Sequence, residues 1–295
     1  MKEGKKKVAV VGALNVDIGG RPDSPLVPGD SIPGRVRVSL GGVGWNVARD
    51  CASLGAETSF FSVLGEDAYA AAIRRDAERF RVDLSRCRWE EAENNRYLNI
   101  TGGTGDVAAA VNDMRLCERA DGSFIRGILP ALRVFDVVAA DANLPVTALR
   151  TLAESVETPL IADGVSAVKC GRLRELLPRI HTLKLNRAEA QALTRRVEPE
   201  DCARALSAAG ARRIVISLSG EGVLCVEGDA LFRLPASGMP LMDATGAGDS
   251  LTSALAVGLA RGLDLRSCAE LGMRAAGITM GQTGAVTEKL AALAI

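Results

Sequence analysis

The sequence has little of the residue types on which several kinds of site depend. It contains one histidine, His181, and aromatic residues make up only 3% of the chain. A Ser-His-Asp triad would depend entirely on His181, which stands in a stretch (179–183) whose pattern indicates a strand, so a structural role is the better interpretation. The scarcity of aromatic rings argues against an extensive base-stacking surface for single-stranded nucleic acid.

Cysteine pairs and long hydrophobic runs are also missing. The seven cysteines form no Cys-x-x-Cys pair and their number is odd, which supports neither a disulfide framework nor a zinc site. No apolar run reaches the ~18–20 residues that span a bilayer. The polar, basic N-terminus leads into a short apolar stretch (8–14) that predicts a first strand rather than a signal peptide. We therefore expect reduced thiols, a cytoplasmic protein and no membrane partner.

The chain has no surplus of either charge. Its 36 Lys and Arg residues balance 36 Asp and Glu residues, so the formal net charge is zero. A general nucleic-acid-binding protein carries a basic surplus, and we expect no nucleic-acid partner here. A net charge of zero is compatible with a nucleoside or a sugar as a small-molecule ligand.

What the sequence does contain is enough apolar material for a sizeable core, since 47% of its 295 residues are hydrophobic. From residue 134 onward, predicted strands and helices alternate with short connections, which is typical of βαβ units and a mostly parallel sheet. Two β-rich segments, about 15–40 and 95–115, are too polar to lie inside that sheet. We expect a single α/β domain, residues 1–295, into which these segments insert as a small separate β layer.

The most informative stretch is 242–249, Met-Asp-Ala-Thr-Gly-Ala-Gly-Asp, which leads into an apolar run that predicts a buried helix. Gly246, Ala247 and Gly248 allow a ligand to approach the backbone closely, and the N–H groups at a helix start attract an anion. A carboxylate beside an anion site, here that of Asp249, is electrostatically unfavourable unless it has a task. Taking a proton from a hydroxyl that attacks a phosphate is such a task. The alternative is a turn followed by an acid that the helix dipole stabilises.

Four more motifs accompany this stretch, in order along the chain. Gly-Ala-Leu-Asn-Val-Asp (12–17) ends the first predicted strand, and Gly-Gly-Val-Gly-Trp-Asn-Val-Ala (41–48) opens the first helix. Asn-Arg-Ala-Glu (186–189) follows a strand, and Ser-Leu-Ser-Gly-Glu-Gly (217–222) forms a turn between two strands. Together the five motifs resemble the ribokinase-like (phosphofructokinase-B) family of sugar and nucleoside kinases over nearly the whole chain. The resemblance implies a three-layer α/β/α fold with a mostly parallel central sheet and a small β lid. No Walker Lys-Ser/Thr motif is present, so a P-loop mechanism is not supported.

The resemblance also implies roles for individual residues of a phosphoryl-transfer centre. Asp249 matches the family's catalytic base, and the turn at 246–248 matches the anion hole that stabilises charge on the transferred group. The implied phosphate donor is ATP. The loop that receives its phosphates would contain Ser217, Ser219, Gly220 and Gly222.

Two metal ions are implied as well. Asn186 and Glu189 match the Asn-x-x-Glu motif that organises Mg²⁺ and its waters around the phosphates. Asp243 and Thr245 match part of a site that holds a monovalent cation, usually K⁺, behind the anion hole. For Glu189 the alternative is an ordinary acid in the first turn of a helix.

On the acceptor side, Asp17 and Asn46 match positions that grip sugar hydroxyls, and we place Asn15 and Gly42 beside them. Asp17 and Asn46 both lie at predicted strand-to-helix edges, where a parallel sheet places its ligands. A carboxylate together with an amide can pair the vicinal hydroxyls of a ribose. The alternatives are a turn cap for Asp17 and a polar helix position for Asn46.

Within the family, the segments 110–114, 163–170 and 178–187 are closest to the pseudouridine kinase branch. That branch phosphorylates the 5′-hydroxyl of pseudouridine, whose uracil ring Asn112 and Asp113 would meet. The alternative for this pair is a β-turn. The chain departs from the branch at Trp45, where a basic residue is commoner, and this departure leaves the substrate contact at that position open.

Other functions remain alternatives at this point. A kinase for another nucleoside or for a pentose would carry the same motifs. A non-catalytic sensor of the same fold would be expected to have lost Asp249 or the turn at 246–248, and both are intact. We also expect a homodimer in which the lids of two subunits pair, because β segments outside the main sheet leave edges that need cover.

Overall fold

The computed structural model describes residues 4–102, 107–236, 242, 244–282 and 284–294. Its largest element is a nine-stranded sheet in the order β15-β14-β13-β12-β11-β10-β1-β4-β6. From β13 to β6 in this order the strands run parallel, whereas β14 pairs antiparallel with both of its neighbours, β13 and β15. The strands of this sheet are β1 (Lys7–Val11), β4 (Glu57–Phe61), β6 (Val82–Asp83), β10 (Val137–Asp141), β11 (Leu160–Asp163), β12 (Thr182–Asn186), β13 (Arg213–Ser217), β14 (Val223–Glu227) and β15 (Ala230–Leu234).

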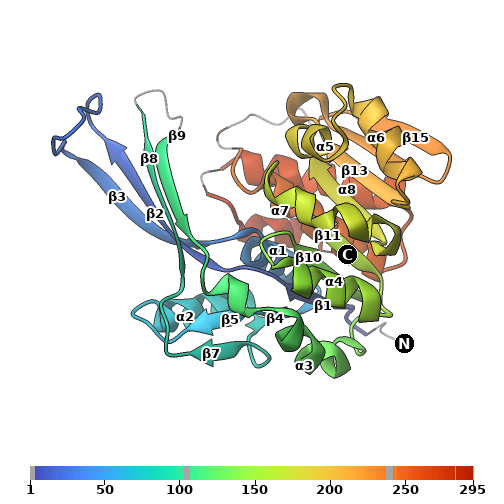
Figure 1. Ribbon diagram of the computed structural model, residues 1–295, viewed down its shortest axis with the longest axis horizontal. Coiled ribbons are helices and arrows are strands. Elements are labelled where there is room, and N and C mark those ends of the chain that lie inside the picture. Colours follow the sequence, from blue (N-terminus) through green and yellow to red (C-terminus); the bar gives the residue numbers. More distant parts are fainter. Residues whose placement is uncertain (1–3, 103–106, 237–241, 243, 283, 295) are drawn as a thin grey trace.

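Helices cover both faces of this sheet (Figure 1). One layer contains α1 (Val43–Ser53), α2 (Ala70–Phe80), α7 (Ala247–Ala260) and α8 (Leu265–Met280). The other contains α3 (Gly122–Leu132), α4 (Val146–Ser155), α5 (Arg187–Thr194), α6 (Pro199–Ala208) and the 3₁₀ segment η2 (Lys169–Arg179). Short 3₁₀ turns complete the chain: η1 (Cys117–Arg119), η3 (Ser219–Glu221) and η4 (Glu288–Leu293).

Each face of the sheet has its own hydrophobic core, because the central strands are apolar on both sides. All five residues of β10 are buried. The helix predicted after Asp249 is α7, and most of its residues beyond the first turn are buried between α1, α8 and the sheet. The three-layer α/β/α fold with a mostly parallel sheet, predicted from the sequence, is thus confirmed.

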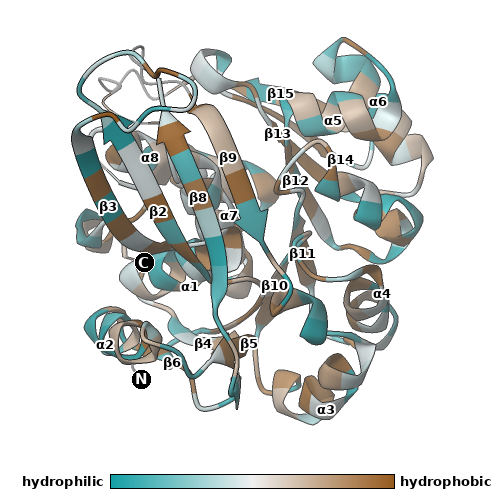
Figure 2. Cartoon of the chain, turned by 60° about the vertical axis from the view of Figure 1, so that its left-hand side comes forward, coloured by the Kyte–Doolittle hydropathy of each residue, from teal (hydrophilic) through white to brown (hydrophobic). Residues whose placement is uncertain are grey.

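A four-stranded sheet stands apart from the main one and extends beyond it (Figure 1). It contains β2 (Asn15–Pro22), β3 (Gly34–Gly41), β8 (Asn95–Thr101) and β9 (Val107–Asp113), in the order β3-β2-β8-β9. These strands come from the segments 15–40 and 95–115 that the sequence places in a separate layer. Hydrophobic and hydrophilic residues alternate along β3, as Figure 2 shows. Of the turn predicted between β8 and β9, residues 103–106 lie outside the described part.

Three further features complete the description. β5 (Val63–Gly65) and β7 (Arg88–Glu90) form a parallel two-stranded sheet. All seven cysteines are free thiols, as expected. Within the described ranges, none of the helices has the length and hydropathy that a membrane crossing needs.

Candidate active site

Polar residues end four neighbouring strands at one edge of the central sheet. β10 ends at Asp141, β11 at Asp163, β12 at Asn186 and β13 at Ser217. The hydroxyl of Thr252 on α7 donates a hydrogen bond to Asp163 Oδ2 at 2.7 Å, which fixes the start of that helix against β11. The edge formed by the carboxyl ends of the strands is where open parallel sheets bind ligands.

Asp249 lies in the first turn of α7 and faces this edge. Its Oδ2 accepts a hydrogen bond of 2.7 Å from Nδ2 of Asn46, which comes from α1. Burial raises the pKa of Asp249 to about 7, and the negative charge of Asp163 adds to the rise. The Asn46 hydrogen bond and the Lys184 ammonium act in the opposite direction. A carboxyl group with a pKa near neutrality can accept a proton during a reaction and release it afterwards.

The turn before Asp249 depends on glycine. Gly246 is the N-cap of α7 with a φ of 81°, and a Cβ there would lie 2.0 Å from the carbonyl oxygen of Ala285. Gly42 caps α1 in a similar way, with a φ of 95° and 2.7 Å between an added Cβ and Ala13 O. Both helix starts therefore require glycine, because φ is positive and backbone from another segment occupies the place of a side chain.

A buried lysine lies directly beneath the turn. Lys184 of β12 pairs its Nζ with Asp163 Oδ2 at 3.0 Å, and a Cβ added to Gly248 would lie only 2.8 Å from the same Nζ. Burial lowers the pKa of Lys184, but Asp163, Glu189 and Asp249 together raise it overall, so the ammonium stays charged. The sequence analysis missed Lys184. Its signal is a lysine between two leucines in a short strand (Thr-Leu-Lys-Leu-Asn), where burial of an unpaired charge would cost free energy.

The predicted acceptor residues Asn15 and Asp17 lie on β2, on the other side of Asp249 from Lys184. The carboxylate of Asp17 lies against the backbone of Gly41. A Cβ added to Gly41 would lie 2.0 Å from Asp17 Oδ2. Burial raises the pKa of Asp17 to about 6, while the charge of Arg49 lowers it. Asn15 Oδ1 is buried with no hydrogen-bond partner in the described part of the chain. A ligand hydroxyl would satisfy this oxygen.

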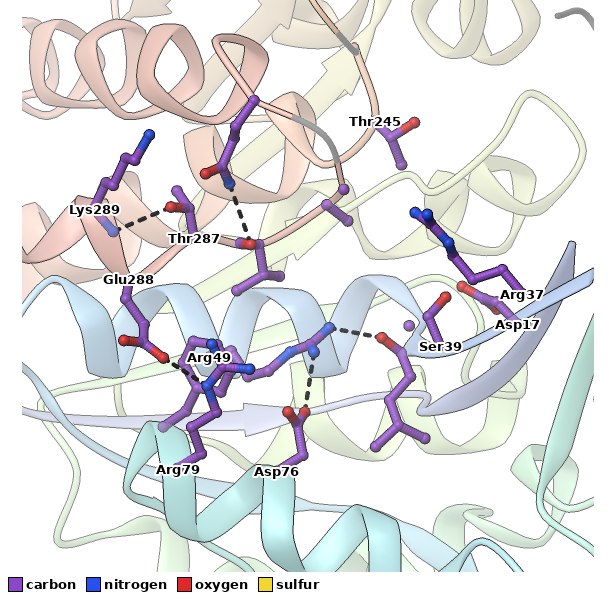
Figure 3. A pocket seen from close by; sticks show the side chains of 17 residues that line it. Asp17, Arg37, Ser39, Arg49, Asp76, Arg79, Thr245, Thr287, Glu288 and Lys289 are labelled. Atoms are coloured by element: carbon purple, nitrogen blue, oxygen red, sulfur yellow. Dashed lines mark hydrogen bonds and ion pairs between the residues drawn. The ribbon is translucent and has the colours of Figure 1, made fainter.

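A cavity of about 730 Å³ opens beside Asp17, between β3, α1, α2 and the segment 282–289. Figure 3 shows Asp17, Arg37 and Ser39 on the side of the four-stranded sheet and Glu288 and Lys289 on the opposite side. The volume is in the range of sites that hold small molecules.

Asn112 and Asp113 occupy different environments. Strand register places Asn112 opposite Tyr97, which in turn lies opposite Asp17, so these three side chains share one face of the small sheet. The next residue, Asp113, points to the other face. Its carboxylate is paired with the Arg115 guanidinium, which holds the pKa of Asp113 at about 2. The structure therefore brings Asn112, but not Asp113, to the face that carries Asp17.

The predicted phosphate loop joins β13 to β14 beside Asn186. Asn186 and Ser217 are register partners on adjacent strands. Ser219 has a φ of 54° although it is not glycine, and Gly222 has a φ of 90°, with 2.0 Å between an added Cβ and a backbone oxygen at 234. Gly220 borders open space. The loop thus has a tight, partly left-handed backbone, in which the N–H groups of Leu218, Glu221 and Gly222 donate to carbonyl oxygens of the loop itself.

Asn186 and Glu189 form a capping box at the start of α5. Asn186 Oδ1 accepts from Glu189 N at 2.9 Å, and the Glu189 carboxylate accepts from Asn186 N at 2.9 Å and from Nδ2 at 2.6 Å. Burial raises the pKa of Glu189, and the Lys184 charge opposes the rise. Because both Glu189 oxygens already accept hydrogen bonds, these residues fit a Mg²⁺ held through water, as Mg²⁺ commonly is, rather than directly.

The remaining predicted positions contribute less to the geometry. Thr245 is exposed at the cavity, and Asp243 lies outside the described residues. In the described ranges, no group of three or more His, Cys, Asp or Glu residues is arranged to hold a metal. Trp45 is fully buried, and its Nε1 donates to Asp76 Oδ2 at 2.9 Å. The substrate contact left open at Trp45 is therefore not made by its side chain.

Comparison with known proteins shows the family of this chain. The chain matches the model of the pfkB family of carbohydrate kinases over residues 5–291. A protein named pseudouridine kinase from Escherichia coli (strain K12) is 31% identical over 261 residues, which cover 85% of this chain and 83% of that protein. A second protein of the same strain, named uncharacterized sugar kinase YeiI, is 33% identical over 280 residues, or 92% of this chain and 77% of that protein.

A solved structure gives the same fold. Ribokinase from Thermotoga maritima superposes with a TM-score of 0.88 over 97% of each chain, at 22% sequence identity. At this identity the likeness concerns the fold, and it confirms the ribokinase-like architecture that the motifs predict.

Proposed function

This chain belongs to the pfkB family of carbohydrate kinases, and we propose that within it the protein uses ATP to phosphorylate the 5′-hydroxyl of pseudouridine. Kinases of this family transfer a phosphoryl group to an alcohol. The choice of pseudouridine is supported by the segments 110–114, 163–170 and 178–187 and by the relative named pseudouridine kinase.

The observation that carries the proposal is the position of Asp249. Its carboxylate adjoins the turn at 246–248, accepts from Asn46 Nδ2 and has a pKa of about 7. In the proposed step the 5′-oxygen forms a bond to the γ-phosphorus of ATP, and the bond from that phosphorus to the bridging oxygen breaks. The hydroxyl proton passes to Asp249, and ADP leaves with the bridging oxygen.

Charge on the transferred group would be stabilised from two sides. The N–H groups of the turn at 246–248 and the positive end of α7 face the anion, and the Lys184 ammonium lies beneath Gly248. The phosphates would rest on the loop 217–222. A Mg²⁺ held through water by Asn186 and Glu189 would neutralise phosphate charge, and Thr245 with Asp243 would contribute to a K⁺ site behind the turn.

The acceptor would be gripped by Asn15, Asp17 and Asn46, with Gly42 allowing close approach. The unpartnered Oδ1 of Asn15 and the Asp17 carboxylate are acceptors for ribose hydroxyls. The small sheet would act as a lid, with Asn112 on the face toward the substrate.

The opposite face of the small sheet fits a second copy of this chain. One row across the sheet, Val38–Ile18–Leu98–Val111, is apolar, and Val38, Leu98 and Val111 are 49%, 44% and 67% exposed. Because exposing an apolar face to water is unfavourable in free energy, we propose that two lids pair through this face in a homodimer.

Product analysis tests the function directly. Pseudouridine, ATP and Mg²⁺ are incubated with the enzyme, and the nucleotide product is identified by mass and by the ³¹P–¹H coupling of its phosphate. We expect pseudouridine 5′-phosphate and ADP in equal amounts, with no product from Asp249→Asn over the same time. A phosphate at another hydroxyl, or none, would refute the proposal.

A second candidate is a kinase for a free pentose or hexose. It is favoured by the 33% identity to the protein named uncharacterized sugar kinase YeiI, and by Asn15, Asp17 and Asn46, which would grip only the sugar part of a nucleoside. Free ribose and fructose, offered in the same assay, distinguish this candidate.

A further inference from the structure

A buried arginine that belongs to none of the predicted sites stands one helical turn after Asn46. Arg49 is only 7% exposed, and its guanidinium joins three elements (Figure 3). Nη1 pairs with Asp76 Oδ2 on α2 at 3.0 Å. Nη2 donates to Leu40 O, near the end of β3, at 3.0 Å and to Asn46 Oδ1 at 2.5 Å.

The contact with Asn46 determines which way its carboxamide points. Because Oδ1 accepts from the guanidinium, Nδ2 faces away from Arg49 and donates to Asp249 Oδ2 at 2.7 Å. A carboxamide turned by 180° would place its oxygen against the Asp249 carboxylate, where only a protonated Asp249 could form a hydrogen bond. The guanidinium thus selects the orientation that supports an ionised carboxylate.

The surroundings of Arg49 favour a functional reason for its burial. Its Nε has no hydrogen-bond partner within the described ranges, and a buried ion pair is often no more stable than a hydrophobic pair of the same size. The Trp45 ring lies 5.6 Å from the guanidinium, and its Nε1 donates to Asp76, so both the cation and its counter-ion are held in place.

We propose that Arg49, anchored by Asp76, is a positioning residue that orients the Asn46 amide toward Asp249 and ties that amide to the base of the small sheet through Leu40 O. This inference rests on the proposed role of Asp249 as the catalytic base. Arg49 acts through Asn46, and its effect on Asp249 should therefore depend on Asn46.

A double-mutant cycle separates this effect from simple loss of a charge. Several other charged or titratable groups also face Asp249, and all of them are present in each of the four proteins; they are Asp50, Asp141, Asp163 and Lys184. The charge of Arg49 also acts on Asp249 directly, so the cycle has to separate that effect from the one that passes through Asn46. We compare wild type, Arg49→Met, Asn46→Ser and the double variant. The readouts are the acid limb of the kcat–pH profile and the ¹³C-carboxyl titration of Asp249 in the unliganded protein, which needs no turnover.

We expect Arg49→Met to move both midpoints upward by about one pH unit and to lower kcat ~10- to 100-fold. In the Asn46→Ser background, replacing Arg49 should cause a clearly smaller shift, because only the direct effect of its charge on Asp249 remains. Arg74→Gln, which removes an exposed arginine of α2 paired with Glu66, should behave as wild type. If Arg49→Met folds poorly, Arg49→Met with Asp76→Asn removes the orphaned charge while leaving an acceptor for Trp45.

Two results would overturn the inference: unchanged midpoints in Arg49→Met, or the same shift with and without Asn46, which would indicate a direct charge effect. If the ¹³C midpoints move as expected but wild-type kcat does not follow the Asp249 titration, the base assignment fails and the orientation by Arg49 stands.

Discussion

The carboxyl group of Asp249 resists ionisation in the folded protein, and this has a consequence for stability. Its pKa is raised by burial from an ordinary 3.8 to about 7. The unfolded chain therefore releases this proton near pH 4 and the folded chain only near pH 7, so this group costs stability as pH rises between those values. We expect Asp249→Asn to melt a few degrees above wild type at pH 8 and at the same temperature at pH 4. Equal Tm differences at both pH values would contradict the assigned pKa, whatever the activity.

Gly248 tests the anion hole because an added side chain meets two obstacles. A Cβ would lie 2.8 Å from Lys184 Nζ, and a branched side chain would also fill the space where phosphate approaches the backbone. We expect Gly248→Val to lower kcat at least ~10²-fold while changing the Kd for the nucleoside little. Both are measured on one preparation, with Gly127→Ala, an α3 glycine whose added Cβ meets nothing, as the matched control. Lost nucleoside affinity with unchanged turnover would contradict this placement.

Single residues divide into those that local pattern predicts and those that it does not. The Gly-Ala-Gly-Asp turn is visible in the sequence because a left-handed glycine and an early-turn acid are local features. Lys184 and Arg49 were missed because their roles depend on partners far away in the chain: Asp163 for Lys184, and Asp76 and Asn46 for Arg49.

Among the elements, the start of α5 combines two tasks that a single substitution can separate. Asn186 and Glu189 cap the helix reciprocally, and the single oxygen of Gln can keep the bond from Asn186 N but not also the one from Asn186 Nδ2. Glu189→Gln should therefore keep the helix start and lower Tm by only a few degrees. It should raise the Mg²⁺ concentration needed for half-maximal activity about tenfold, because a negative charge near the metal is lost. A large fall in Tm with unchanged Mg²⁺ dependence would show that the motif serves only the helix.

The elements themselves were predictable where periodicity is strong. The buried strands β10 to β13 and the helix α7 follow from apolar runs between turn signals. α3 was missed because Gly122, Gly127 and Pro130 weaken its helical pattern, and tertiary packing forms the helix nonetheless. β15 was missed although four of its five residues (Ala-Leu-Phe-Arg-Leu) are apolar, and the Gly-Asp pair at 228–229 is the hairpin signal that could have found it.

At the scale of the whole molecule, the exposed apolar row of the small sheet predicts a homodimer. Val111→Glu places a charge at its most exposed member, 67% exposed, and should shift the protein from a dimer to a monomer in sedimentation or light scattering. Val168→Glu, at an 89% exposed valine outside the small sheet, is the control and should leave the mass unchanged. A wild-type protein that is monomeric at high concentration would refute the pairing of lids.

Substrate choice tests the central claim most directly. The kcat/KM values for pseudouridine, uridine and free ribose are measured with ATP and Mg²⁺ on one preparation. We expect pseudouridine to exceed uridine by about one to two factors of ten, because a site that pairs the additional N–H of pseudouridine leaves a buried acceptor unpaired when that group is missing. Free ribose should be poorer still, because it lacks every contact that the base uses to orient the 5′-hydroxyl toward Asp249. Equal values for uridine and pseudouridine would remove the pseudouridine assignment, and a higher value for ribose would move the protein to the sugar kinases.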